Sequence, residues 1–233
     1  MLPLDYSLLS SSQAMQAARE GYIPVVPFGS LEQHCKGPLG ADSIIVEAVA
    51  REACRRARLR GAPCLVLPTV YYGFSPEWLN AGGAVSLGLE AFVFMARSIL
   101  DSLYYAGFSR ILLLNGHGGN SGLLYSAAVE WVSRHRGSIV AVADYWRLAG
   151  VDIGHASRVE EKLLSDAGVE AYMGDCESIA IGGPGRIVNP PPSTASIKPR
   201  LEDEGKATLS YVADKVVGFL VGLKHADPGA YSI

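Results

Sequence analysis

The sequence predicts an α/β fold built on a mostly parallel central sheet. Short β-rich runs alternate with amphipathic stretches along the chain, which is the pattern of successive βα units. The run Ile111–Leu114 is wholly apolar, as expected for a central parallel strand with both faces buried. The 233 residues are 49% hydrophobic and 18% charged, which is enough for a sizeable core and excludes a disordered chain. We expect one domain over residues 1–233.

The elements are expected in the following order. Apolar residues at helical spacing predict helices over Ser10–Glu20, Ile44–Arg58, Leu89–Ala106, Leu123–Arg136 and Ala207–Leu223. Apolar runs predict strands over Ile23–Phe28, Cys64–Pro68, Ile111–Leu114 and Ser138–Ala143. The prolines of the first strand favour a sheet edge, and Asp42-Ser43 is expected to cap the second helix. Residues 144–174 give no clear pattern.

Charge and composition argue against several partners. A formal net charge of −3 gives no electrostatic reason to expect nucleic acid or an anionic membrane. No apolar run reaches the roughly 18 residues that a membrane span needs, and residues 1–5 do not resemble a secretory signal. The four cysteines form no CxxC pair and are too scattered for a disulfide scaffold, so we expect a reduced, cytoplasmic protein.

Two polar motifs directly follow predicted strands. Glu32 and His34 are two residues apart, so in extended backbone they point to the same side, and Asp42 follows at a helix start. These residues are either metal ligands or an ordinary strand end and helix cap. The glycine-rich loop Asn115–Asn120 lacks the Lys-Ser/Thr ending of a P-loop, so its His117 favours a metal ligand over a phosphate cradle. Because the carboxyl ends of parallel strands share one edge, these loops should meet there.

Together these motifs resemble the creatininase family of metal-dependent amidohydrolases. The family pattern G-S-x-E-Q-H-G-P-H-L-P-L-x-T-D corresponds to Gly29–Asp42, N-G-H-G-G-N to Asn115–Asn120, and H-A-G-x-x-E-T-S to Tyr172–Ser178. The family's E-H…P-G-T-x-S-L corresponds to 77–87. The resemblance implies a three-layer α/β/α fold, two divalent metal ions (Zn, Mn or Fe(II)) and a homo-oligomer, often a hexamer.

The resemblance also implies a ligand set. Glu32, Asp42 and His117 would hold one ion. His34, the shared Asp42 and a further carboxylate, assigned here to Glu177, would hold the other. In creatininase proper that carboxylate lies two residues after the loop histidine. A pair of cations that share a carboxylate lowers the pKa of a bridging water, which makes hydroxide available to attack a carbonyl.

The residues of the N-G-H-G-G-N loop are also candidates for contact with the substrate. Asn115, or the amides of Gly118 and Gly119, would donate hydrogen bonds to the oxyanion. Creatininase itself, unlike the family members with the N-G-H-G-G-N loop, has a Tyr-Glu pair where this chain has Gly118-Gly119. Creatinine itself is therefore not the expected substrate.

This chain departs from the family pattern at positions that serve substrate and proton transfer. Trp78 replaces the histidine of E-H, and Lys36 lies where the family has a second loop histidine. Both are candidate substrate contacts, although each also fits a packed aromatic or a solvated charge. Tyr172 aligns with the histidine of H-A-G-x-x-E-T-S and is a candidate catalytic residue. The proton donor stays open among Tyr172, Asp175 and His155.

The resemblance implies a hydrolase that cleaves a C–N amide-type bond, in a cyclic amide or formamide of small size, through a metal-activated hydroxide. One alternative is a deformylase acting on a formylaminopyrimidine ribotide, as in archaeal flavin and deazaflavin synthesis. Another is a short-peptide peptidase of the mycofactocin-maturation type. A third is a non-catalytic descendant that binds a small ligand.

Overall fold

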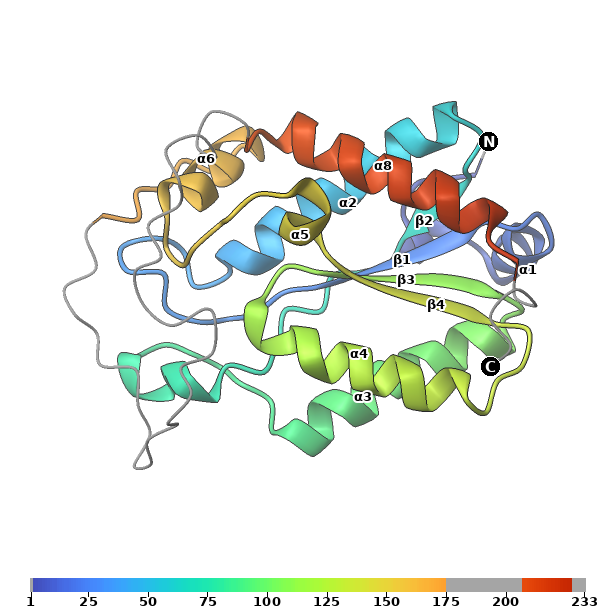
Figure 1. Ribbon diagram of the computed structural model, residues 1–233, viewed down its shortest axis with the longest axis horizontal. Coiled ribbons are helices and arrows are strands. Elements are labelled where there is room, and N and C mark those ends of the chain that lie inside the picture. Colours follow the sequence, from blue (N-terminus) through green and yellow to red (C-terminus); the bar gives the residue numbers. More distant parts are fainter. Residues whose placement is uncertain (1, 175–206, 228–233) are drawn as a thin grey trace.

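A four-stranded parallel sheet forms the centre of the chain, in the strand order β2-β1-β3-β4 (Figure 1). The computed structural model describes residues 2–174 and 207–227. The strands are β1 Ile23–Phe28, β2 Cys64–Val66, β3 Arg110–Asn115 and β4 Ile139–Asp144. The parallel sheet predicted from the alternating pattern is therefore present, with strand bounds close to the expected ones.

Helices cover both faces of the sheet, so the three-layer α/β/α fold is confirmed (Figure 1). Alternation along β3 explains the two layers: Leu112 and Leu114 enter one core, while Ile111 and Leu113 enter the other. The first core lies under α2, α5, α6 and α8, and the second under α1, α3 and α4. The helices are α1 Ser11–Arg19, α2 Ala41–Leu59, α3 Leu89–Tyr105, α4 Ser121–Val132, α5 Tyr145–Ala149, α6 Arg158–Asp166 and α8 Leu209–His225, with 3-10 turns η1 Tyr6–Leu8, η2 Pro76–Ala81 and η3 Gly118–Asn120.

The prolines of β1 do not place it at an edge, because the strand lies between β2 and β3. The Pro27 carbonyl accepts a hydrogen bond from Val70 on the β2 side at 2.9 Å, but β2 pairs only with residues 23–25. Pro24 turns to the opposite side, where β3 pairs only with residues 25–28. The nitrogens of Pro24 and Pro27, which carry no hydrogen, therefore each face a neighbouring strand outside the residues that pair with it. For this reason β1 can lie in the centre of the sheet without losing a hydrogen bond between strands.

The predicted helix cap at Asp42 is wrong. Helix α2 begins at Ala41 with Gly40 at the N-cap, and no side chain caps it. The Asp42 carboxylate lies in the first turn and accepts a hydrogen bond from Ser30 Oγ at 2.8 Å. Its side chain is turned into the interior, where it meets two histidines, instead of back onto the helix end.

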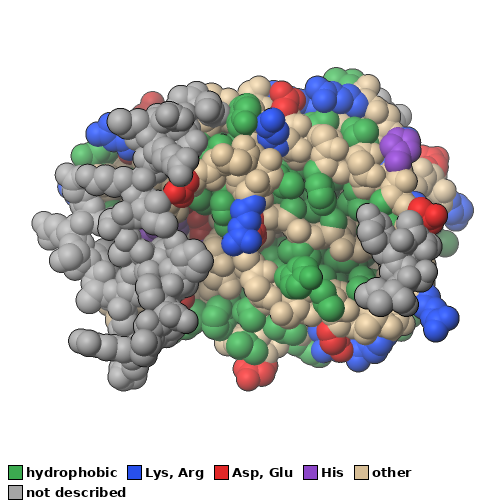
Figure 2. All heavy atoms as spheres, in the orientation of Figure 1, with side chains coloured by type: hydrophobic (Ala, Val, Ile, Leu, Met, Phe, Trp, Pro, Cys, Tyr) green, Lys and Arg blue, Asp and Glu red, His purple; other side chains and the backbone are tan. Residues whose placement is uncertain are grey.

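The helices, the surface charges and the cysteines relate to the expectations about membranes, charged partners and disulfides. Among the described residues, none of the helices is long and apolar enough to cross a bilayer. On the face drawn in Figure 2, basic and acidic side chains are interspersed among apolar ones. Cys54 and Cys64 are free and buried.

Candidate metal centre

Four of the predicted metal ligands lie together at the carboxyl edge of the sheet. Glu32 and His34 lie on the loop after β1, Asp42 on the first turn of α2, and His117 on the loop after β3. All four side chains are buried. Because the strands are parallel, these three segments lie at one edge, which is the usual ligand-binding edge of such a sheet.

The two ring nitrogens of His117 have different surroundings. Nε2 lies 3.0 Å from the Phe74 carbonyl oxygen, which can only accept, so Nε2 carries a hydrogen. In the neutral ring, Nδ1 therefore directs its lone pair at Asp42 Oδ2, 3.0 Å away, and at Glu32 Oε2, 3.3 Å away. Glu32 Oε2 is buried and has no hydrogen-bond partner among the described residues. Three electron-pair donors thus converge, and a proton or a metal ion must lie between them.

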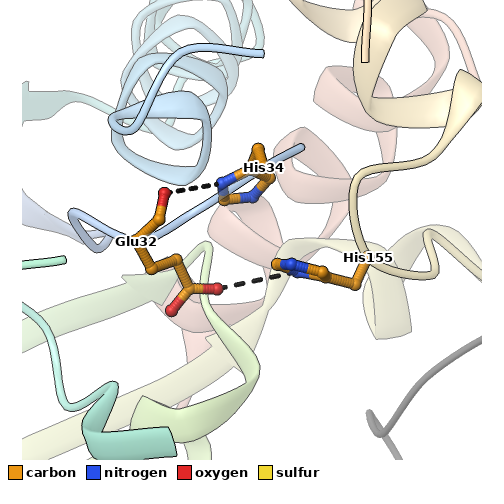
Figure 3. Close-up of side chains that lie close together, drawn as sticks. All are labelled: Glu32, His34 and His155. Atoms are coloured by element: carbon orange, nitrogen blue, oxygen red, sulfur yellow. Dashed lines mark hydrogen bonds and ion pairs between the residues drawn. The ribbon is translucent and has the colours of Figure 1, made fainter. Parts of the chain in front are cut away.

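His34 repeats this arrangement on the other side of Asp42. Its Nδ1 lies 3.2 Å from the backbone carbonyl oxygen of Glu32 and therefore donates to it (Figure 3). Its Nε2 faces Asp42 Oδ1 at 3.2 Å and Glu160 Oε1 at 3.8 Å. Asp42 consequently presents one carboxylate oxygen to each histidine, which is the geometry of a shared ligand.

The charges of this cluster shift the pKa values strongly. Burial alone would lower the pKa of His34, but Asp42 and Glu160 raise it well above its ordinary value. Burial also opposes the charged form of His117, yet Glu32 and Asp42 raise the pKa of that ring too. Burial works against the Asp42 carboxylate, but the two histidines lower its pKa. In the absence of a metal ion, the centre therefore retains protons on its histidines.

Glu160 was not identified from the sequence. It is 2% exposed and lies in the first turn of α6, where its Oε2 accepts a hydrogen bond from the Ser157 backbone at 3.0 Å. A signal was present: His155-Ala156 and Glu160 fit the H-A-G-x-x-E pattern with only Ser157 in place of glycine. His155 and Glu160 therefore offer a second match to that pattern, and both lie among the other ligand candidates. Tyr172 is exposed, and most of the Tyr172–Ser178 match lies outside the described residues.

Gly119 shows why the acid cannot follow the loop histidine in this chain. A Cβ atom at Gly119 would lie 2.2 Å from the Phe74 carbonyl oxygen and 2.5 Å from His117 Nε2. Any side chain there would break the hydrogen bond that orients His117. The carboxylate that faces His34 comes from α6 instead, through Glu160.

His155 lies beside the ligand candidates Glu32 and His34. Its Nδ1 lies 3.7 Å from Glu32 Oε1 (Figure 3), and its ring lies 4.8 Å from that of His34 between centroids. Burial and the neighbouring His34 lower the pKa of His155. The buried ring of Trp78 stacks on His155 at 4.5 Å and 12°. Trp78 is thus brought next to the ligand candidates, where it packs as a buried residue, and its role as a substrate contact stays a prediction.

The hydrogen bonds that Asn115 makes within the protein leave it no donor for a substrate oxyanion. Its Nδ2 donates to the His117 carbonyl oxygen and to Asp144 Oδ1, each at 2.7 Å, and also lies 3.1 Å from Ser121 Oγ. Its Oδ1 accepts from the His117 backbone N–H at 3.1 Å. Because an amide nitrogen has only two hydrogens, this fully buried side chain has none left for a substrate. Asn115 instead anchors the loop that carries His117.

The other predicted residues lie farther out or outside the described chain. Tyr172 is 65% exposed, and Lys36 Nζ lies 6.0 Å from the centroid of its ring, so these two contact each other at the surface. Gly118 is exposed at the start of η3. Asp175 and Glu177 lie outside the described residues, and the ligand role of Glu177 stays a prediction.

Within the described residues, three groups bring potential ligand atoms within 4.8 Å of one another. They are Glu32/Asp42/His117, His34/Asp42/Glu160 and Glu32/His34/His155. The first two share Asp42 and contain one histidine with two carboxylates each. Such oxygen and nitrogen donor sets suit Zn, Mn or Fe(II).

Curated proteins with similar sequences are hydrolases. A mycofactocin precursor peptide peptidase of Mycobacterium tuberculosis is 34% identical over 125 residues, which is 51% of this chain and 49% of that protein. One of Mycobacterium ulcerans is 29% identical over 194 residues, covering 80% and 71%. A 3-dehydro-scyllo-inosose hydrolase of Thermotoga maritima is 26% identical over 115 residues, covering 48% and 35%. The M. tuberculosis match thus spans about half the length of that relative.

Solved structures with the same fold are creatininases. A manganese creatininase superposes with a TM-score of 0.75 at 17% identity, covering 97% of this chain and 100% of that one. A mutant creatininase of Zn-Zn type gives the same TM-score, identity and coverage. The family profile described as creatininase, creatinine amidohydrolase, matches residues 7–168, a range that contains every described ligand of the centre. This chain therefore belongs to the creatininase family.

Proposed function

We propose that this chain is a metal-dependent hydrolase that cleaves a C–N amide-type bond and binds two divalent metal ions. The observation that carries the proposal is the pair of buried histidines that each direct one ring nitrogen at a different carboxylate oxygen of Asp42. Oε2 of Glu32 supports the same conclusion: it accepts no hydrogen bond from the described residues, and a buried carboxylate oxygen is costly unless a proton donor or a cation binds it.

The residues present fit two ions that share one ligand. Glu32, Asp42 and His117 would hold one, and His34, Asp42 and Glu160 would hold the other. Similar folds have been solved in manganese and zinc-zinc forms, which supports Mn or Zn as the metal, while Fe(II) stays an expectation from the donor set. When bound, ions of this kind polarise a substrate carbonyl and make hydroxide available near neutral pH.

The chain's own residues supply orientation around the centre. The Phe74 carbonyl holds the ring of His117, and Ser30 holds Asp42 through a buried hydrogen bond of 2.8 Å. Partners of this kind fix ligand orientation and typically account for about 10- to 100-fold in metal affinity or activity. His155, stacked on Trp78, lies beside the ligands and is placed to contact a substrate.

The proposed substrate is a small molecule with a cyclic amide or formamide group. Lys36, Gly118 and Gly119 stay candidates for contact with it, and the homo-oligomer and the cytoplasmic location stay expectations. A second candidate is hydrolysis of a short peptide, since curated relatives from two mycobacteria are named mycofactocin precursor peptide peptidases.

Metal analysis and a substrate panel test the proposal together. The purified full chain should contain close to two equivalents of metal after loading with Zn, Mn or Fe(II) in separate samples. Each sample is then assayed with lactams, formamides and short peptides, with Glu32→Gln as the inactive control. Turnover of lactams or formamides alone supports the small-molecule proposal, and turnover of peptides alone supports the peptidase. Binding of no metal would reject both in favour of a non-catalytic protein.

A further inference from the structure

Gln33 lies between two of the candidate ligands, and both ends of its buried amide have partners. Its Oε1 accepts a hydrogen bond from the backbone N–H of Cys35 at 2.9 Å. A backbone N–H can only donate, so the atom that faces it must be the amide oxygen. The other end of the amide, the NH2 group, therefore lies 2.8 Å from Nε2 of His155.

This contact determines where His155 carries its proton. An amide NH2 group only donates, so His155 Nε2 must accept, and the neutral ring has its hydrogen on Nδ1. The Nδ1–H lies on the side of the ligands, 3.7 Å from Glu32 Oε1. That separation is longer than a hydrogen bond, so the hydrogen is not committed to any described residue.

The other two rings of the site have the opposite arrangement. In His34 and His117 the outer nitrogen donates to a backbone carbonyl, so in the neutral ring a lone pair faces the carboxylates. In His155 the outer nitrogen accepts, so an N–H faces them. A protonated ring nitrogen has no lone pair for a metal ion. Glu32, His34 and His155 are therefore close enough together to bind a metal ion, but the His155 nitrogen that faces the other two has no lone pair to offer it.

We propose that Gln33 is a positioning residue that holds His155 in its Nδ1–H tautomer, as a hydrogen-bond donor to the substrate and not as a metal ligand. This inference rests on the proposed function, because the acceptor would be the carbonyl oxygen of the amide that is cleaved. Stacking on Trp78 at 12° fixes the plane of the His155 ring and hence the direction of its N–H.

Nitrogen-15 NMR of the histidine side chains in the full chain, loaded with cadmium-113, tests this directly. His155 signals are assigned by their loss in His155→Asn. In the wild-type chain we expect Nδ1 at a protonated-type shift, Nε2 at an unprotonated-type shift, and cadmium–nitrogen coupling at His34 and His117 only. His155 protonated at Nε2, or coupled to cadmium, would overturn the inference.

Two substitutions of Gln33 sharpen the test. Gln33→Glu has the same shape but accepts from His155, so the tautomer should reverse and the cadmium coupling of His155 should appear. Gln33→Met removes the donor and should give a mixture of tautomers. His135, which stacks on Trp131 at 3.8 Å, reports an intact fold if its signals are unchanged. An unchanged Nδ1–H tautomer in the folded Gln33→Glu chain would contradict the inference. Cadmium coupling at no histidine would count against the proposed function, while the wild-type tautomer would still decide the role of Gln33.

Discussion

Asp42 Oδ2 lies 3.0 Å from Nδ1 of His117, and this nitrogen must hold a proton or a metal ion between the two atoms, because the opposite nitrogen already donates to a backbone carbonyl. The second oxygen of Asp42 has the same relationship to His34. One carboxylate therefore connects two potential ion sites, and its loss should affect both.

Asp42→Asn should abolish binding of both ions, because the amide keeps the shape but lacks the charge that each site shares. We expect metal content near zero and a loss of affinity well above the roughly 100-fold that an outer partner accounts for. Ser30→Ala is the matched control, since it removes only the 2.8 Å hydrogen bond to Asp42 and should cost about 10- to 100-fold. Metal analysis and calorimetric titration measure both. Two ions retained by Asp42→Asn would contradict the shared-ligand arrangement.

Glu160→Gln should remove one ion and leave the other. The substitution keeps the fold, because glutamine also serves at the third position of a capping box such as that of Ser157. Glu161→Gln is the control: this neighbouring side chain accepts from the Met173 backbone and lies in none of the ligand groups of the described chain. We expect one equivalent of metal in the first variant and two in the second. Two equivalents in both would favour Glu177 as the ligand.

Asn115→Ala should act through stability and metal retention, because Asn115 holds the backbone of His117 on both sides. Unpaired buried groups cost about 1–3 kcal/mol, and each kcal/mol lowers Tm by about 2–4 °C in a chain of this size. Ser121→Ala removes the hydrogen bond to Asp144 and the 3.1 Å contact with Asn115 Nδ2 but leaves both hydrogen bonds between Asn115 and the His117 backbone, so it should have a smaller effect. Thermal unfolding checks both. Lost turnover with unchanged Tm and metal content would restore the oxyanion role to Asn115.

The metal-free protein should become less stable as pH rises above about neutral. The folded pKa values of His34 and His117 are raised above the ordinary 6.5, so their stabilising contribution is complete below pH 6.5 and is lost as pH rises through the raised values. The lowered pKa of His155 has the opposite effect: it makes the folded protein less stable as pH falls below 6.5. The lowered pKa of Asp42 does the same as pH falls below the ordinary value of 3.8.

Thermal unfolding of the chelator-treated chain between about pH 6.5 and 9 measures this effect. With zinc bound the fall should disappear, since the ion replaces the protons between the histidines and the carboxylates. A metal-free Tm that stays constant or rises over the same range would show that these histidines do not retain protons in the folded state.

Several features were predictable because they depend on local pattern alone. The wholly apolar Ile111–Leu114 had to be a buried strand, and the polar residues after it had to reach the carboxyl edge of the sheet. Motif order also singled out Glu32, His34, Asp42 and His117, and the structure brings these four together.

Other features depended on contacts between distant segments. The central place of β1 follows from where its neighbours begin and end their pairing, which its own prolines do not reveal. Asp42 had the sequence of a helix cap, but two histidines from other loops attract its carboxylate.

The sequence by itself determined the layered fold and four of the residues at the centre, because periodicity and motif order are properties of neighbouring positions. Only the tertiary structure decided that Glu160 faces His34, and which nitrogen of each ring carries the proton. The physical reason is that a hydrogen-bond partner fixes a tautomer, and those partners come from parts of the chain that only folding brings together.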